Sequence, residues 1–86
     1  MTIREIFARN LRRLRHSRRL SQEKLAHLAG IDRTYVSSLE RSVYSPTIDM
    51  VATLATILEV SPEDLLRADL AVAAPGETTR EELFPS

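Results

Sequence analysis

Short hydroxyl side chains and arginines are concentrated in the stretch LAGIDRTYVSSLER, residues 28–41. A helix that turns Val36 and Leu39 inward would turn the following side chains outward: Arg33, Thr34, Ser37, Ser38 and Arg41. Hydroxyl and guanidinium groups suit base edges and phosphates, and the major groove of DNA is wide enough for a helix. A polar outer face is common on surface helices, so this pattern alone fits simple solvation equally well.

Arrangements typical of catalysis or metal binding are absent from the sequence. No serine is paired with a histidine and an acid that could activate it. His16 and His27 lie in different segments without acidic residues at ligand spacing, and the chain has no cysteine. Asp49, Glu63 and Asp64 fall in expected first turns of helices, where they stabilise the N-terminus. We therefore expect no enzymatic activity, no metal and no cofactor.

Helix start signals recur along residues 2–67, and no segment alternates as a strand would. Thr2 followed by Glu5 is a capping box, which predicts a helix over residues 3–17. Four more helices are expected after these N-cap residues: Ser21, Asp32, Thr47 and Ser61. Their expected ranges are about 22–29, 33–41, 48–58 and 62–67. The prediction is an all-α, compact five-helix domain over residues 1–67, followed by a partly helical or disordered tail of residues 68–86.

Gly30 interrupts the helical pattern between the second and third predicted helices. Glycine supplies the left-handed residue with which many helices end, and Asp32 can restart the next helix two residues later. A sharp turn at this point lets the second helix brace the third, which then projects. This is helix-turn-helix geometry.

The charges are divided between the two halves of the chain, although the net charge is zero. Residues 1–41 carry ten basic and four acidic side chains, whereas residues 42–86 carry two and eight. This polarity suggests that the first half meets an anion while the second half stays away from it. No apolar run is long enough for a membrane span, so we expect a cytoplasmic protein without a membrane partner.

Three runs together resemble the lambda-repressor-like helix-turn-helix class, which includes phage Cro and repressors, small bacterial regulators and restriction–modification controller proteins. The runs are SQEKLAHLAGI, YVSSLER and LEVSPEDLL. The resemblance implies a compact DNA-binding fold in bacteria or phage, with the protein associated with the nucleoid through its DNA. It also implies that bases are read by Arg33, Thr34, Ser37 and Ser38.

The same resemblance implies phosphate contacts and one structural pair. The implied phosphate contacts are Ser21, Gln22, Tyr35, Arg41 and Ser42. Arg15 and Glu40 match an arginine–glutamate pair that ties the first helix to the third. Arg41 and the 42–45 loop match a segment that follows the DNA backbone in this class, and the loop here is less basic than in some members.

We expect a sequence-specific regulator of transcription that binds double-stranded DNA. It would act as a homodimeric repressor on a palindromic operator, with two copies of the third helix in successive major grooves about 34 Å apart. A candidate dimer patch is formed by apolar residues at the edge of the fourth helix and beyond it: Met50, Ile57, Leu66 and Leu70. The alternative is that the tail folds over this patch.

A function of another class is also compatible with the sequence. The acidic tail, residues 68–86, carries Leu83 and Phe84, which would suit contact with a partner protein. An antitoxin or an anti-regulator would use the tail in this way.

Overall fold

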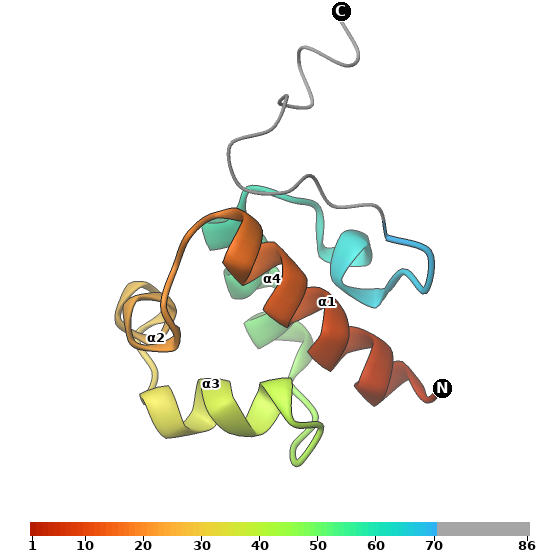
Figure 1. Ribbon diagram of the computed structural model, residues 1–86, viewed down its shortest axis with the longest axis horizontal. Coiled ribbons are helices and arrows are strands. Elements are labelled where there is room, and N and C mark those ends of the chain that lie inside the picture. The colour runs from red at the N-terminus through yellow and green to blue at the C-terminus, as the bar shows by residue number, and fades with distance from the viewer. Residues whose placement is uncertain (71–86) are drawn as a thin grey trace, which may run out of the picture.

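The computed structural model describes residues 1–70, and these residues contain four α-helices and no strand. The helices are α1 (Ile3–Ser17), α2 (Gln22–Ala29), α3 (Arg33–Glu40) and α4 (Ile48–Leu58). In Figure 1, α1 runs diagonally in front of α4, α2 lies to one side, and α3 forms the lower edge of the molecule. Most of the predicted tail, including Leu83 and Phe84, lies outside the described residues.

The fifth predicted helix is not an α-helix. Residues Pro62–Leu66 form a short 3-10 helix, η1, and Arg67 returns to an extended backbone conformation. Five residues beginning at a proline give too few α-type hydrogen bonds for a second turn, and the tighter 3-10 turn is common in such short pieces. The prediction of five α-helices was therefore wrong in its last element.

The helix starts are as predicted. The side-chain oxygens of Thr2, Ser21, Asp32 and Thr47 each accept a backbone N–H from the first turn of the helix that follows. The backbone N–H of Thr2 also donates to Oε1 of Glu5 at 2.8 Å, which completes the capping box. This hydrogen bond holds the pKa of the Glu5 carboxyl below its ordinary value of 4.5, because it favours the charged form.

All four α-helices end in the same way, by a Schellman motif. In each, a residue at the C-cap or directly after it has a left-handed conformation, and the next N–H donates back to a carbonyl five residues earlier. The four left-handed residues, with φ between 57° and 70°, are Arg19, Gly30, Ser42 and Glu59. Only Gly30 adopts this conformation without a steric cost from Cβ.

The hydrophobic core lies between all four α-helices and η1. Its largest fully buried side chains include Phe7, Leu11, Leu39, Leu54 and Leu65. No helix among residues 1–70 is long and apolar enough to cross a membrane.

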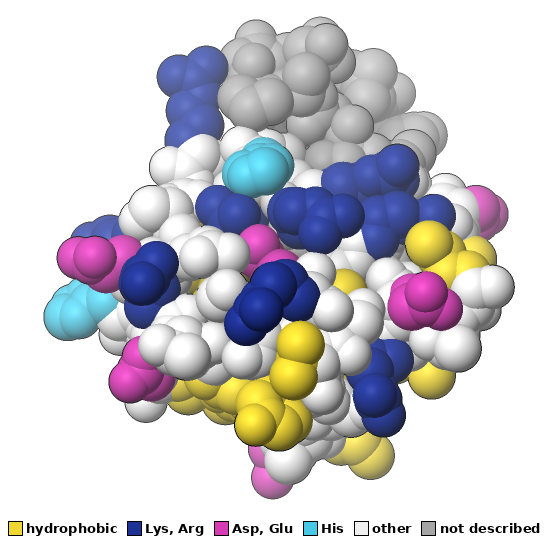
Figure 2. All heavy atoms as spheres, turned by 60° about the horizontal axis from the view of Figure 1, so that its bottom comes forward, with side chains coloured by type: hydrophobic (Ala, Val, Ile, Leu, Met, Phe, Trp, Pro, Cys, Tyr) yellow, Lys and Arg dark blue, Asp and Glu magenta, His cyan; other side chains and the backbone are white. Residues whose placement is uncertain are grey.

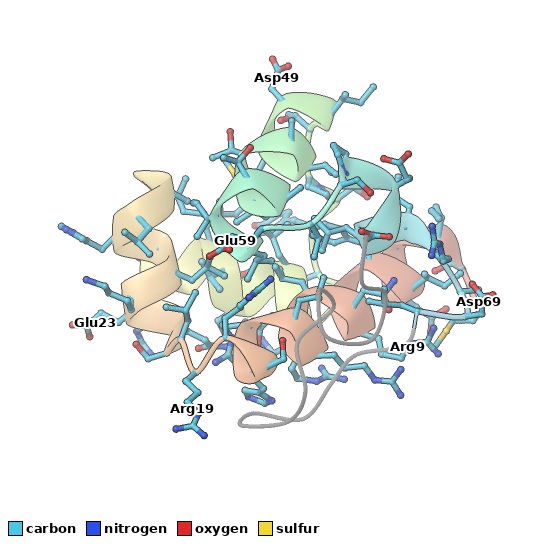
Figure 3. The ribbon with its side chains drawn as sticks, turned by 90° about the horizontal axis from the view of Figure 1, so that it is seen from above. Arg9, Arg19, Glu23, Asp49, Glu59 and Asp69 are labelled. Carbon is cyan, nitrogen blue, oxygen red and sulfur yellow. The ribbon has the colours of Figure 1, made fainter. Side chains whose placement is uncertain are left out.

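Ile48 is the first residue of α4 and is 88% exposed, although it is apolar. Figure 3 shows the reason, because the end of α4 that carries Asp49 projects beyond the neighbouring helices. Ile48 therefore projects away from the core, whereas Met50 packs against it and Val51, Leu54, Ala55 and Leu58 are buried.

One buried polar side chain ties η1 to α1. Asn10 is fully buried, and its Nδ2 donates to the carbonyl oxygens of Asp64, Leu65 and Arg67 at 3.3, 3.1 and 2.8 Å. These bonds satisfy carbonyl groups at the end of η1 that have no partner within so short a helix.

Candidate nucleic-acid interface

The turn between α2 and α3 leaves one long side of α3 exposed to solvent. Gly30 has φ 70° and ψ 31°, and Asp32 caps α3 by accepting the N–H of Thr34 at 2.8 Å. Val36 and Leu39 are fully buried, which fixes the rotation of α3 about its axis. Arg33 and Thr34 are consequently exposed at the N-terminal end of α3, and Ser37 is half-buried on the same side.

Ser38 does not lie on the outer face. It was expected to point outward with Arg33, Thr34 and Ser37, but it is only 6% exposed. The chain bends back after α3, and the N–H of Val43 donates to the Ser38 carbonyl at 2.9 Å. Ser38 thus lies on a buried flank of α3 and not on the exposed face with Arg33 and Thr34.

The residues Arg15 and Glu40 meet in a buried ion pair. Arg15 Nε lies 2.6 Å from Glu40 Oε2, and Arg15 Nη2 lies 3.0 Å from Glu40 Oε1. Arg15 is 8% and Glu40 4% exposed, and Arg15 Nη1 also donates to the Leu20 carbonyl. Two parallel bonds of this kind fix orientation as well as distance, so the pair locks α3 against α1.

Gln22 joins this pair at the N-terminus of α2. Its Nε2 donates to Glu40 Oε1 at 3.1 Å, and the side chain is half-buried. Nε2 carries a second hydrogen, so an amide held in this way has a donor left for an anion. Sequence reasoning placed Gln22 at a phosphate but missed its bond to Glu40.

The other phosphate candidates lie at the two ends of the α2–α3 unit. Ser21 is exposed, although its hydroxyl already accepts the Lys24 N–H. At the far end of α3, Arg41 is exposed and Ser42 is half-buried. Tyr35 is half-buried on the flank of α3.

Further arginines border this region. Figure 2 turns the underside of Figure 1 forward and shows Lys and Arg side chains spread across that face. A surface hollow of about 410 Å³ lies between α1 and the end of α3, and Arg9, Arg12 and Arg41 line it. Arg12 also donates to the Glu40 carbonyl at 3.2 Å. Sequence reasoning missed this hollow, because it is assembled from segments about 30 residues apart.

The candidate dimer residues are less exposed to solvent in the structure than the sequence suggested. Met50, Ile57 and Leu70 are half-buried and pack against the core, whereas Leu66 is 40% exposed.

The comparisons with known proteins agree with this geometry. A family described as "Helix-turn-helix" matches residues 11–65, which include α2, α3 and α4, the last seven residues of α1 and most of η1. The chain belongs to the helix-turn-helix family.

Three relatives of this helix-turn-helix chain illustrate the family. Control protein C.SmaI of Serratia marcescens is 42% identical over 66 residues, which are 77% of this chain and 79% of that protein. The restriction-modification controller protein C.AhdI from Aeromonas hydrophila has a TM-score of 0.69 at 40% identity, over 72% of this chain and 94% of that one. The DNA-binding domain of the P22 C2 repressor has a TM-score of 0.71 at 28% identity, over 76% and 86%.

These matches establish a lambda-repressor-like helix-turn-helix fold and a DNA-binding regulator of transcription rather than an enzyme. Within this fold, α2 is the bracing helix and α3 is the projecting helix of the motif.

Proposed function

We propose that the protein is a sequence-specific repressor of transcription that binds a palindromic operator as a homodimer. The observation that carries this proposal is the outer face of α3. Arg33 and Thr34 stand exposed at its N-terminal end, while Val36, Leu39 and the Arg15–Glu40 pair hold the helix from behind. In helix-turn-helix proteins it is the N-terminal part of the second helix that contacts base edges.

Arg33, Thr34 and Ser37 are the proposed base-reading residues. A guanidinium can donate two parallel hydrogen bonds to O6 and N7 of guanine, and hydroxyl groups can pair with several bases. Ser21, Gln22, Tyr35, Arg41 and Ser42 are the proposed phosphate contacts. A phosphate looks alike at every base pair, so these residues would position the protein rather than select a sequence.

A homodimer follows from the size of the interface. A single small module buries too little surface on DNA for a high specificity ratio, and two copies on a palindrome double the contacts. The proposed dimer surface combines exposed Leu66 with the half-buried side chains of Met50, Ile57 and Leu70. Binding of the dimer across a promoter would exclude polymerase, and the name of the P22 C2 repressor is consistent with this sign of regulation.

Selection of bound sites from random DNA duplexes tests the proposal directly. The expected product is a palindrome whose half-sites are centred about one helical turn, roughly 34 Å, apart. Enrichment of no sequence, or of an unpaired half-site, would contradict the homodimeric operator.

The roles of Arg33 and Gln22 can then be separated on every single-base variant of the selected operator. Arg33→Ala should cost about 1–3 kcal/mol on the operator and relax one position in each half-site. Gln22→Ala should weaken all variants by a similar factor and leave the pattern of preference unchanged. A uniform loss for Arg33→Ala would make Arg33 a backbone contact and leave base reading to Thr34 and Ser37.

A further inference from the structure

His16 is an exposed histidine near the end of α1 that contacts a buried arginine. Its Nε2 lies 3.2 Å from Nη2 of Arg15, and the same Nη2 donates to Glu40 Oε1 at 3.0 Å. A guanidinium group only donates hydrogen bonds, so Nε2 of His16 is the acceptor in this contact. An imidazole that accepts a hydrogen bond is neutral, and the contact therefore selects the neutral form of His16.

The neighbours of His16 on α1 are basic. Arg12 and Arg13 precede it by about one turn, which places their side chains beside it on the helix. On α3, Glu40 already accepts hydrogen bonds from two side chains. On α2, Glu23 points away from α1 (Figure 3). A proton on the His16 ring would thus lie among guanidinium groups, with neither of these acids available to pair with it.

The acids of α4 and η1 lie on other sides of α1. Arg18 donates to two carbonyl oxygens at the end of α4, one of them that of Glu59, and lies roughly 200° around α1 from His16. Asn10 donates to the carbonyl of Asp64 in η1 and lies roughly 120° around α1 from His16. His16 is therefore turned away from both of these acidic elements.

Shared partners join His16 to Gln22, the proposed phosphate contact at the start of α2. Arg15 Nη2 contacts both the imidazole and Glu40 Oε1. The same oxygen accepts a hydrogen bond from Gln22 Nε2 at 3.1 Å. Along this chain of contacts, one nitrogen and one oxygen separate the imidazole from the Gln22 amide. An anion that accepts the second amide hydrogen of Gln22 would lie beside the His16 ring.

We propose that His16 takes up a proton when the protein binds its operator, and that the charged ring donates a hydrogen bond to the phosphate held by Gln22. This proposal rests on the proposed function. The proton comes from the solvent, and the phosphodiester remains an anion before and after binding. The ring gives up its contact with Arg15, whose Nη2 keeps its bond to Glu40. The phosphate thus supplies the negative charge that Glu23 and Glu40 do not offer to a charged His16.

The pH dependence of operator binding then has a definite sign. Histidine side chains ordinarily change charge between about pH 5 and 8. Because the complex holds one more proton per subunit than the free protein, its affinity is greatest at the acid end of this range and falls as pH rises through it. The carboxyl of Glu5, whose pKa lies below its ordinary value, stays charged over the same range. The two histidines, His16 and His27, are the side chains whose contributions have to be separated.

Operator binding at about pH 7.5 and about pH 5.5, at constant salt, tests the uptake of the proton. The unaltered protein should bind about tenfold tighter per subunit at the lower pH, the effect of one hydrogen bond to a charged group. His16→Gln should abolish this gain. His27→Gln is the matched control and should keep the gain, because His27 is exposed and lies roughly 140° around α2 from Gln22. Equal affinity of the unaltered protein at both pH values, or a gain that His16→Gln retains, would overturn the proposal.

A permanent charge at residue 16 tests where the proton acts. His16→Lys should bind at about pH 7.5 as tightly as the unaltered protein does at about pH 5.5. Its slope of log K against log salt should be more negative by about 0.9 per subunit, because one more phosphate is neutralised. His27→Lys should change neither quantity by as much, and thermal unfolding checks that the variants keep their fold. An effect of His16→Lys no larger than that of His27→Lys would overturn the phosphate contact.

The proposed function and the proton uptake can fail separately. Failure of the unaltered protein to select any DNA at either pH would overturn the proposed function, and this inference with it. Selection of a palindrome whose affinity does not depend on pH would overturn the proton uptake alone.

Discussion

Glu40 is the residue on which the arrangement of the first three helices depends. Its carboxylate accepts hydrogen bonds from Arg15 and Gln22, and its backbone carbonyl accepts one from Arg12. One buried acid thus links α1, the start of α2 and the end of α3. Because a buried charge is costly without its partner, the pair must be formed or removed as a unit.

We expect Glu40→Ala to lower the free energy of unfolding by about 3–5 kcal/mol, because it leaves the Arg15 guanidinium buried and unpaired. The double change Arg15→Met with Glu40→Leu should cost less than Glu40→Ala alone, since apolar groups of similar volume need no partner. Urea unfolding monitored by circular dichroism measures both. If Glu40→Ala lowers the free energy of unfolding no more than the double change does, the pair does not hold α3.

For single residues, the sequence predicted interaction partners better than it predicted exposure to solvent. The resemblance pointed to Arg15 and Glu40, and the structure brings these two together. The resemblance did not indicate the hydrogen bonds of Asn10, whose three carbonyl partners lie more than 50 residues away along the chain. The exposure of Ser38 was predicted wrongly, because angles around an isolated helix do not show which flank the rest of the fold buries.

The elements themselves were largely predictable, because their signals are local. Each α-helix starts at the side-chain cap that the sequence indicated, and Gly30 adopts the left-handed conformation that the turn required. The 3-10 form of η1 and the exposure of Ile48 were not predictable, since they depend on how far the neighbouring helices extend. The left-handed conformations of Arg19, Ser42 and Glu59 were not predictable either, because none of these residues is a glycine.

We expect Gly30→Ala to destabilise the fold by about 1–2 kcal/mol, which is the cost of a left-handed conformation with a Cβ atom. A Cβ built at Gly30 meets nothing within 4 Å, so the backbone conformation is the only source of this cost. The reverse change, Glu59→Gly at the end of α4, is the control and should stabilise by up to about 1 kcal/mol. Thermal unfolding compares the two, and equal shifts of the same sign would contradict the explanation.

The charges of the described residues are divided along the chain, between its first three helices and the rest. Residues 1–41 supply α1, α2 and α3 with an excess of basic side chains, whereas residues 42–70 carry one basic and five acidic ones. Glu59 lies on the side of the molecule opposite α3 (Figures 1 and 3). Glu59 therefore lies away from a polyanion that approaches α3.

We expect operator binding to weaken steeply with salt. A dimer with roughly 6–10 phosphate contacts should lose about 10³–10⁵ in affinity between roughly 50 and 200 mM salt. Fluorescence anisotropy with a labelled operator gives the slope. A flat response on a well-defined site would contradict the assignment of residues 1–41 to the phosphate side.

The left-handed conformations at Arg19 and Glu59 have a consequence for the evolution of this fold. Both residues are exposed and lie outside α3, and each occupies a conformation that glycine adopts at lower cost. The free energy of unfolding could therefore be raised by substitution at two sites that are separate from those that would read bases. Glycine at either position could compensate for a destabilising substitution on α3, so a lineage could acquire a new operator without losing its fold.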